Sequence, residues 1–264
     1  MAKRRIIPKL QLSESSILPD ELVLVTTKKY KNFLEIGSPV SQAKIYEAQC
    51  IDELILLYLS PSKGKHDNKD LFLKTLRALS SEVFIPLGVG GGIEHIDDIK
   101  ILLQNGADKV VINSVAHKSP EFVRKAANRF GSQCIVVSID FRLTQTNEVE
   151  LYSNGGQVLE DVDPDQWINK MVSFGAGELI FNAIDCDGSM NGLPTDLLKS
   201  LTQEINVPII ISGGCGEAQH FVDGFNELAI EAIAAGTFFC KQDQNPIQIR
   251  SQIQNAGIEL RSYT

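Results

Sequence analysis

The chain alternates short apolar runs with amphipathic stretches along its length. The apolar runs are continuous and rich in Val, Ile and Leu, which is typical of parallel strands covered on both faces. The predicted strands are RIIPKLQL (5–12), ELILLYL (53–59), VFIPLGV (83–89), KVVIN (109–113), CIVVSID (134–140), ELIFNAI (178–184), VPIIIS (207–212) and EAIAA (231–235).

Helical patterns fit between these strands. The stretch IDDIKILLQNG (96–106) ends at a glycine, which is a helix C-cap signal. The stretch PEFVRKAANRFG (120–131) begins with proline and also ends at glycine. Eight strands that alternate with helices predict an α/β chain folded as a single (β/α)₈ barrel domain over residues 1–264.

An internal repeat supports the barrel. The motif PLGVGGG starts at Pro86, and PIIISGG starts 122 residues later, at Pro208. At the same offset, NGADKVVINS (105–114) falls on ELAIEAIAAG (227–236). Two half-barrels of four units each explain this repeat.

The repeat also relates the polar ends of two strands. It places Gln11, near the end of the first strand, opposite Asp140, at the end of the fifth. The longest connections, residues 12 to about 38 and 141 to about 163, correspond as well. Connections of this length are often lids or binding loops.

Composition narrows the classes of function. The net charge is −8, which gives nonspecific nucleic-acid binding no support, and no apolar run reaches the roughly 18 residues of a membrane span. The five cysteines are odd in number and form no C-x-x-C pair, so a disulfide framework or a zinc site is not expected. We expect a cytoplasmic protein without a metal or another cofactor.

Glycine pairs follow two of the predicted strands. Without a Cβ atom, Gly91 and Gly92 after the third strand, and Gly213 and Gly214 after the seventh, let backbone N–H groups approach a phosphate closely. The alternative is that they only make tight turns. Because small polar residues follow one strand later in both halves, we predict two phosphate sites and a substrate with a phosphate at each end. The remaining predicted phosphate-binding residues are Asn113, Ser114, Asp187, Gly188, Ser212, Gly236 and Thr237.

Two sets of ionisable residues stand at opposite ends of the predicted barrel. Asp140, at the C-terminal end of its strand, is a candidate general acid or base, or else a structural cap of the following loop. Two cations and two carboxylates stand at strand starts: Arg5, Glu53, Lys109 and Glu178. They could form a solvated rim of charges, or a closed ring of ion pairs that plugs the bottom of the barrel.

Motifs along nearly the whole chain resemble one family. The motifs are RIIP, GSPV (37–40), DELI, FIPLGVGGGI, LLQNGADKVVINS, RFGSQCIVVSID, GAGELIFNAIDCDGSMNG and PIIISGGCG. Together they resemble the cyclase subunit of imidazole glycerol phosphate synthase, a barrel of histidine biosynthesis.

The resemblance implies that the two ends of the barrel have different functions. A glutaminase partner would dock on the bottom face, where Asp108 matches a partner-facing position. Its ammonia would pass a gate formed by the four charges at the strand starts. At the top the ammonia would meet a bisphosphate substrate, which the glycine loops hold and on which Asp140 acts as a catalytic acid.

This chain departs from the family pattern at the other catalytic acid. Family members end the first strand in C-L-D, and this chain has Lys9, Leu10 and Gln11. A glutamine amide cannot act as a general acid or base. Tyr58 stands where the family has a further aspartate, and Thr237 stands where it has serine.

Four functional interpretations remain open at this point. The combination resembles a paralogous branch linked to bacterial surface sugars, in which a glutaminase, a barrel and a separate sugar amidotransferase convert an acetamido into an acetamidino group. The chain could instead be a true cyclase that tolerates Gln11, or a non-catalytic scaffold that activates the glutaminase. The sister isomerase of histidine biosynthesis fits least, because it needs the missing acid and has no ammonia gate.

Overall fold

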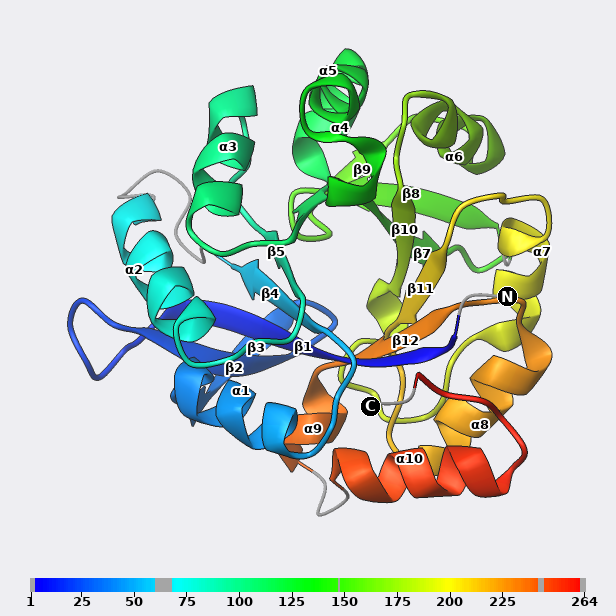
Figure 1. The fold of residues 1–264 in the computed structure, drawn as a ribbon. Coiled ribbons are helices and arrows are strands. Elements are labelled where there is room, and N and C mark those ends of the chain that lie inside the picture. Colours follow the sequence, from blue (N-terminus) through cyan, green and yellow to red (C-terminus); the bar gives the residue numbers. More distant parts are fainter. Residues whose placement is uncertain (1–2, 60–67, 147, 242–244, 262–264) are drawn as a thin grey trace.

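Eight parallel strands close into a barrel in the computed structural model, which describes residues 3–59, 68–146, 148–241 and 245–261. The barrel strands are β1 (Arg5–Glu14), β4 (Leu54–Tyr58), β5 (Leu87–Gly90), β6 (Lys109–Ile112), β7 (Ile135–Leu143), β10 (Glu178–Ala183), β11 (Ile209–Ser212) and β12 (Ala232–Ala235). Each barrel strand pairs with the next, and β12 returns to β1, so the eight strands form a closed barrel (Figure 1). The predicted (β/α)₈ fold is confirmed.

Helices surround the barrel, as Figure 1 shows. Their bounds are α1 (Pro39–Ala48), α2 (Lys69–Ser80), α3 (Ile96–Gln104), α4 (Ser114–Lys118), α5 (Glu121–Phe130), α6 (Pro164–Ser173), α7 (Thr195–Thr202), α8 (Ala218–Glu227), α9 (Thr237–Lys241) and α10 (Pro246–Asn255). The side chains of Ser38 and Asp163 cap α1 and α6, each just before a proline. Gly131, with φ +89°, ends α5 where the sequence predicts. No helix in the described ranges is long and apolar enough to cross a membrane.

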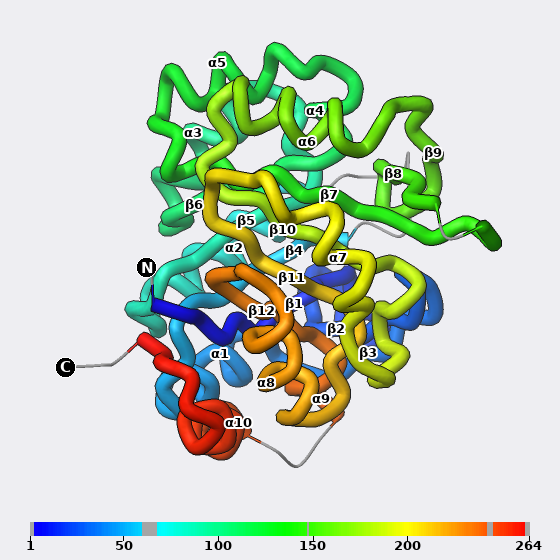
Figure 2. Tube along the Cα trace, turned by 90° about the vertical axis from the view of Figure 1, so that its right-hand side faces the viewer, coloured from blue at the N-terminus to red at the C-terminus, as the bar shows by residue number. Residues whose placement is uncertain are grey.

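The two long connections form antiparallel hairpins. After β1 come β2 (Leu22–Lys28) and β3 (Lys31–Gly37), and after β7 come β8 (Val149–Ser153) and β9 (Val158–Glu160). Figure 2 shows both hairpins at the end of the barrel opposite the chain termini. This end, where the barrel strands finish, is called the mouth below, and the end where they begin is called the bottom.

Side chains inside the barrel form layers. Along β1, alternation points Ile7, Lys9 and Gln11 inward, one above another. A separate apolar cluster fills the middle of the barrel and consists of Ile7, Ile55, Val111, Val136, Ile180, Ile210, Ala232 and Ala234, with Leu57 packed against it. Polar side chains stand above this layer at the mouth, and charged ones stand below it at the bottom.

Candidate functional site

Asp140 lies buried at the mouth, on β7, with 7% of its surface exposed. Its Oδ1 atom accepts hydrogen bonds from Ser138 Oγ at 2.7 Å and from Asn182 Nδ2 at 2.9 Å. Asn182 reaches it because β10 pairs with β7 in a register that sets these two residues side by side. The carboxylate is thus held in one orientation by two neighbouring strands.

The surroundings of Asp140 shift its acidity. Burial raises the pKa of the Asp140 carboxyl, and the negative charge of Asp187 adds to this effect. The hydrogen bonds from Ser138 and Asn182 and the charge of Lys9 oppose burial without cancelling it. A carboxyl group whose pKa is raised can hold and release a proton closer to neutral pH, as a general acid or base must.

Gln11 occupies the equivalent register in the other half of the barrel. It pairs with Leu57 of β4, just as Asp140 pairs with Asn182 of β10. It is 3% exposed, and its Oε1 atom lies 3.2 Å from the hydroxyl of Thr27. The repeat therefore puts an amide where a second acid would stand, and the leucine beside it offers no polar support.

Lys9 also lies at the mouth, although the sequence analysis did not identify it as a site residue. It is 4% exposed, and its Nζ atom donates to Asn182 Oδ1 at 3.1 Å and lies 5.9 Å from the centre of the Tyr30 ring. Burial lowers the pKa of Lys9, and the carboxylates of Asp187 and Asp140 act in the opposite direction. Its inward position follows from strand alternation, which is the signal that could have identified it.

The tip of the β2–β3 hairpin is fastened to the loop after β10. Lys29 and Tyr30 both have positive φ, 54° and 58°, which is the geometry of a two-residue type I′ turn. Asp187 Oδ2 accepts from Thr27 Oγ1 at 2.6 Å and from the Tyr30 amide at 3.2 Å. A Cβ atom on Gly188 would lie 2.2 Å from the Thr27 carbonyl oxygen. Asp187 and Gly188 therefore hold this hairpin, and their contact with a phosphate stays a prediction.

The two predicted glycine loops adopt matching conformations. Gly91 has φ +108° and Gly213 has φ +101°, which side chains rarely tolerate. A Cβ atom would lie 2.3 Å from the carbonyl oxygen of Tyr58 in the first case and 2.6 Å from that of Ala183 in the second. Both loops thus require glycine for close backbone approach, in addition to any ligand.

The second glycine loop opens onto a narrow pocket at the mouth. Its lining combines this loop, the loop after β12, the loop after β10 and one strand residue, and consists of Lys9, Asp187, Gly188, Ser212, Gly213, Gly214, Cys215, Ala235, Gly236 and Thr237. Ser212 is fully buried, and its hydroxyl has no hydrogen-bond partner in the described part of the chain. Most buried polar side-chain atoms in folded proteins have a hydrogen-bond partner, so this hydroxyl is available to a ligand in the pocket.

In the first half the corresponding polar residues hold the other hairpin. Asn113 Nδ2 donates to the carbonyl oxygen of Tyr152 on β8 at 3.4 Å, and Ser114 Oγ accepts from the Asn154 amide at 3.0 Å. The buried Oδ1 atom of Asn113 has no partner among residues 3–59, 68–146, 148–241 and 245–261. Asn113 Oδ1 is therefore, like the Ser212 hydroxyl, a buried polar atom without a hydrogen-bond partner in the described part of the chain.

The four charges at the strand starts form a closed ring. Arg5 contacts Glu53, at 2.6 Å, and Glu178. Lys109 Nζ lies 3.0 Å from Glu53 and 2.8 Å from Glu178. The side chains of Glu53 and Glu178 are only 3% and 6% exposed, so this is not a solvated rim. Burial disfavours the charge on Arg5, but the two carboxylates outweigh it, and the pKa of Arg5 is raised.

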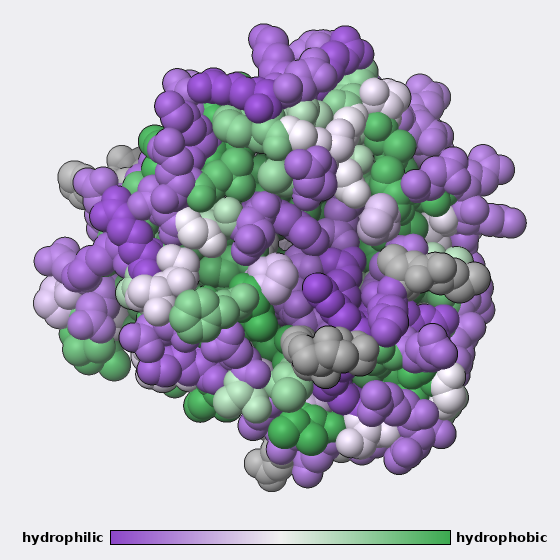
Figure 3. Space-filling view, in the orientation of Figure 1, coloured by the Kyte–Doolittle hydropathy of each residue, from purple (hydrophilic) through white to green (hydrophobic). Residues whose placement is uncertain are grey.

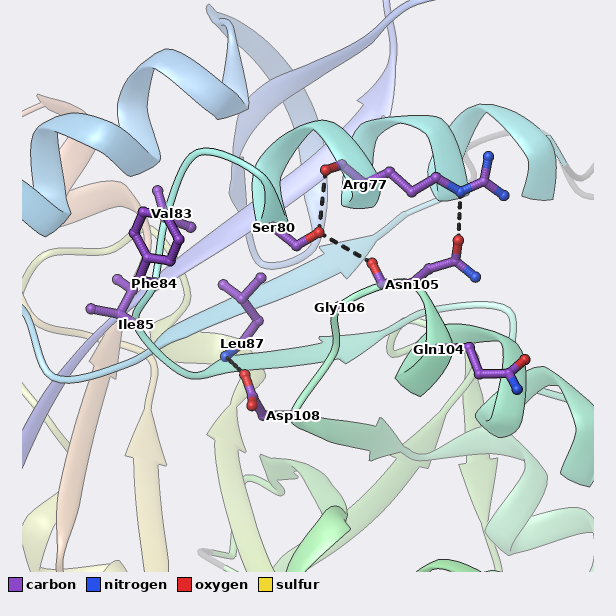
Figure 4. A pocket seen from close by; sticks show the side chains of 10 residues that line it. All are labelled: Arg77, Ser80, Val83, Phe84, Ile85, Leu87, Gln104, Asn105, Gly106 and Asp108. Atoms are coloured by element: carbon purple, nitrogen blue, oxygen red, sulfur yellow. Dashed lines mark hydrogen bonds between the residues drawn. The ribbon is translucent and has the colours of Figure 1, made fainter.

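A shallow depression of about 510 Å³ lies beside the ring on the bottom face. Figure 4 shows Asp108 accepting a hydrogen bond from the Leu87 amide, for which the distance is 2.8 Å, and Phe84 on the segment before β5 that lines the same depression. Phe84 is 87% exposed. In Figure 3, which looks onto this end of the barrel, hydrophilic residues gather at the centre and hydrophobic patches flank them. Because aromatic residues are enriched at protein interfaces, this face is a candidate interaction surface.

Tyr58, which stands where the family pattern has an aspartate, does not point into the mouth of the barrel. Its side chain faces outward from β4, stacks on Phe72 of α2 with 5.3 Å between ring centres, and donates to Glu14 at 3.1 Å. It belongs to the core between barrel and helices. The change at this position therefore affects packing outside the barrel.

Along nearly its whole length the chain is similar to proteins of histidine biosynthesis. Residues 5–244 match the family model described as histidine biosynthesis protein. The chain is 47% identical over 262 residues to the "Putative imidazole glycerol phosphate synthase subunit hisF2" of Prochlorococcus marinus (strain MIT 9313), covering 99% of both chains. It is 34% identical over 264 residues to imidazole glycerol phosphate synthase subunit HisF of Bacillus cereus (strain ATCC 10987 / NRS 248), covering 99% of this chain and 100% of that protein.

Proposed function

Because the chain belongs to the histidine biosynthesis protein family, we propose that it is the barrel subunit of a glutamine-dependent enzyme. It takes ammonia from a glutaminase docked on its bottom face and delivers it to a phosphorylated acceptor at the mouth. The closed ring of Arg5, Glu53, Lys109 and Glu178, directly beneath an apolar interior, carries this proposal.

The layered interior suits neutral ammonia. Moving an ion into an apolar interior costs several kcal/mol or more, whereas a small neutral amine loses far less solvation. The layer around Ile7 and Val136 therefore favours NH₃ over ammonium. The ring below it has no net charge and gives the passage an end that a partner's contacts could open.

The mouth supplies the chemistry at the other end. Asp140, with its raised pKa, is suited to move protons as ammonia adds to an electrophilic carbon. The glycine loops after β5 and β11 are suited to bind phosphate, and at the second loop the unpartnered Ser212 hydroxyl could donate to it. The two loops come from equivalent strands of the two half-barrels, which fits an acceptor with a phosphate at each end.

For the acceptor, we propose a phosphorylated precursor of a bacterial surface sugar. With a separate sugar amidotransferase, its acetamido group becomes an acetamidino group when the delivered nitrogen replaces the carbonyl oxygen, which leaves as water. One observation supports this choice over the histidine-pathway cyclase. Gln11 stands where the second acid of the cyclisation reaction would be. Genes for sugar modification next to this gene, rather than genes of histidine biosynthesis, would agree with this choice.

A cyclase assay tests the proposal. Purified protein receives the ribulosyl bisphosphate substrate of the cyclase family with a high concentration of ammonium salt, which bypasses the glutaminase. We expect no turnover. Turnover at the rate of a family member assayed in parallel would establish the histidine-pathway cyclase instead. Binding of the bisphosphate without turnover would mean a disabled cyclase that keeps its pocket, and absence of both would point to a new acceptor, such as the sugar precursor.

A further inference from the structure

A buried cation stands at the inner wall of the mouth pocket, where the family motif has cysteine. Lys9 lines the pocket together with Ser212, the glycines after β11 and the loop after β12. The strand pairing explains this, because β1 and β12 are neighbours and Pro8 pairs with Ala235, just before Gly236. The Lys9 side chain is 4% exposed, so its charge is shielded from solvent and strong toward whatever enters the pocket.

Lys9 has N–H donors that form no hydrogen bond within the described residues. An ammonium group has three N–H donors, and Lys9 makes one hydrogen bond within the described ranges, to Asn182 Oδ1 at 3.1 Å. The Tyr30 ring covers another side, with its centre 5.9 Å from Nζ. The charged groups that face Lys9 are the carboxylates of Asp187, from the loop after β10, and Asp140, from β7. Neither is within ion-pair distance of Nζ.

We propose that Lys9 is the cationic ligand of a phosphate monoester group held between the loops after β11 and β12. This inference rests on the proposed function, which places a phosphorylated acceptor at the mouth. Backbone N–H groups of Gly213, Gly214 and Gly236, together with the Ser212 hydroxyl, contact the phosphate oxygens, and Lys9 supplies the charge. In family members with cysteine at this position, backbone amides and hydroxyls would bind the phosphate without a cation from this strand.

The negative surroundings make this charge necessary. Asp187 also lines the pocket, and a carboxylate repels a phosphate dianion in a site of low dielectric. Lys9 offsets that repulsion. In the free protein, burial lowers the pKa of Lys9. A bound dianion raises this pKa again, so phosphate binding takes up a proton wherever the pH lies between the free and the bound pKa. Affinity then falls as the pH rises through the bound pKa.

Titration of the full-length protein with inorganic phosphate tests the proposal. At pH 8, where phosphate is almost entirely a dianion, calorimetry measures affinity, and amide NMR shifts of Gly213 and Gly236 identify this pocket, whereas those of Gly91 and Asn113 report on the other loop. We expect Lys9→Met to weaken phosphate binding at this pocket about tenfold or more, because a charge-assisted hydrogen bond is lost. Lys29→Met, which removes a half-exposed lysine at the hairpin tip, is the matched control and should change affinity less than twofold.

A second measurement does not depend on the variant folding. Calorimetry of the wild type in pairs of buffers with different heats of ionisation is repeated from pH 8 to about pH 10.5, the ordinary value for lysine. It should show net proton uptake on phosphate binding at the pH values between the free and the bound pKa of Lys9, and Lys9→Met should show none. If Lys9→Met binds phosphate as tightly as the wild type, or the wild type takes up no proton at any of these pH values, the role of Lys9 is wrong and the phosphate sites stand. If no amide near either loop responds in the wild type, the phosphate-binding part of the proposed function fails as well.

Discussion

At the bottom of the barrel, the Nζ atom of Lys109 lies 2.8 Å from Oε2 of Glu178, although Glu178 stands 69 positions later in the chain. The same ammonium group reaches Glu53, and Arg5 closes the ring from the other side. Each buried carboxylate thus faces two cations.

Lys109→Met should destabilise the protein by about 3 kcal/mol, because it leaves two buried carboxylates with one cation between them. Urea denaturation measures the change. Lys199→Met is the matched control, since Lys199 pairs with Asp196 and Glu227 but is 47% exposed, and it should cost about 0–1 kcal/mol. In the complex with the glutaminase, Lys109→Ala should uncouple glutamine hydrolysis from product formation. Unchanged coupling would mean that the ring only stabilises the barrel.

Asp140→Asn should lower ammonia-dependent turnover by about 10²–10⁴-fold and leave stability equal or higher at neutral pH. Burial raises the pKa of Asp140 in the folded state, so its ionised form disfavours folding at pH values above that pKa. The disadvantage disappears as the pH falls through the raised pKa toward the ordinary value of about 3.9. Melting temperatures of both proteins across this range should therefore converge on acidification. Full activity of Asp140→Asn in the complex would instead support the non-catalytic scaffold.

Gln11→Asp should confer turnover of the cyclase-family bisphosphate with ammonium salt, about 10²-fold or more above the wild type, because it restores the second acid opposite Asp140. Gln11→Asn is the control, since it has the same size as aspartate without a titratable group. Both side chains lose the contact with Thr27, so a shared effect would come from packing. Equal turnover of wild type and Gln11→Asp would show that the amide at this position is not what limits cyclisation.

Gly213→Ala should cost about 3 kcal/mol or more and abolish phosphate binding at its loop, because the new Cβ atom meets the Ala183 carbonyl oxygen at 2.6 Å and the backbone is left-handed. Gly155→Ala separates the two causes. Gly155 also has positive φ, +63°, but a Cβ atom there would meet nothing within 4 Å in the described part of the chain, so we expect about 1 kcal/mol. Chemical denaturation and phosphate titration measure both effects. Similar costs for the two variants would refute the argument from close backbone approach.

Phe84→Ser should weaken binding to the glutaminase of the same organism about tenfold or more while leaving stability within about 0.5 kcal/mol. Phe84 is exposed, lines the same depression as Asp108, and is aromatic, as many interface anchors are. Analytical ultracentrifugation or calorimetry measures the affinity. Ile17→Ser, at a residue 79% exposed at the mouth end, is the control and should leave affinity unchanged. Equal weakening by both variants would place the docking surface elsewhere.

The sequence by itself determined the local features of this protein. Apolar runs marked all eight barrel strands, and glycine and proline marked helix ends such as Gly131. The repeat identified two loops that need glycine and the equivalence of Gln11 with Asp140. These features depend on neighbours a few residues apart, or on identical patterns that recur at a fixed offset, and both can be read along the chain.

Only the tertiary structure decided which distant side chains meet. Four charges at strand starts became a ring, because closure of the barrel brings their strand ends around one axis. Tyr58 stacks on Phe72 of α2, and Lys9 lines one pocket with the loops after β11 and β12, because barrel closure and helix packing bring these elements together. The anchoring of the hairpin by Asp187 depends on a contact over 157 residues. Such pairings arise from long-range packing, which the linear pattern of apolar and polar residues does not encode.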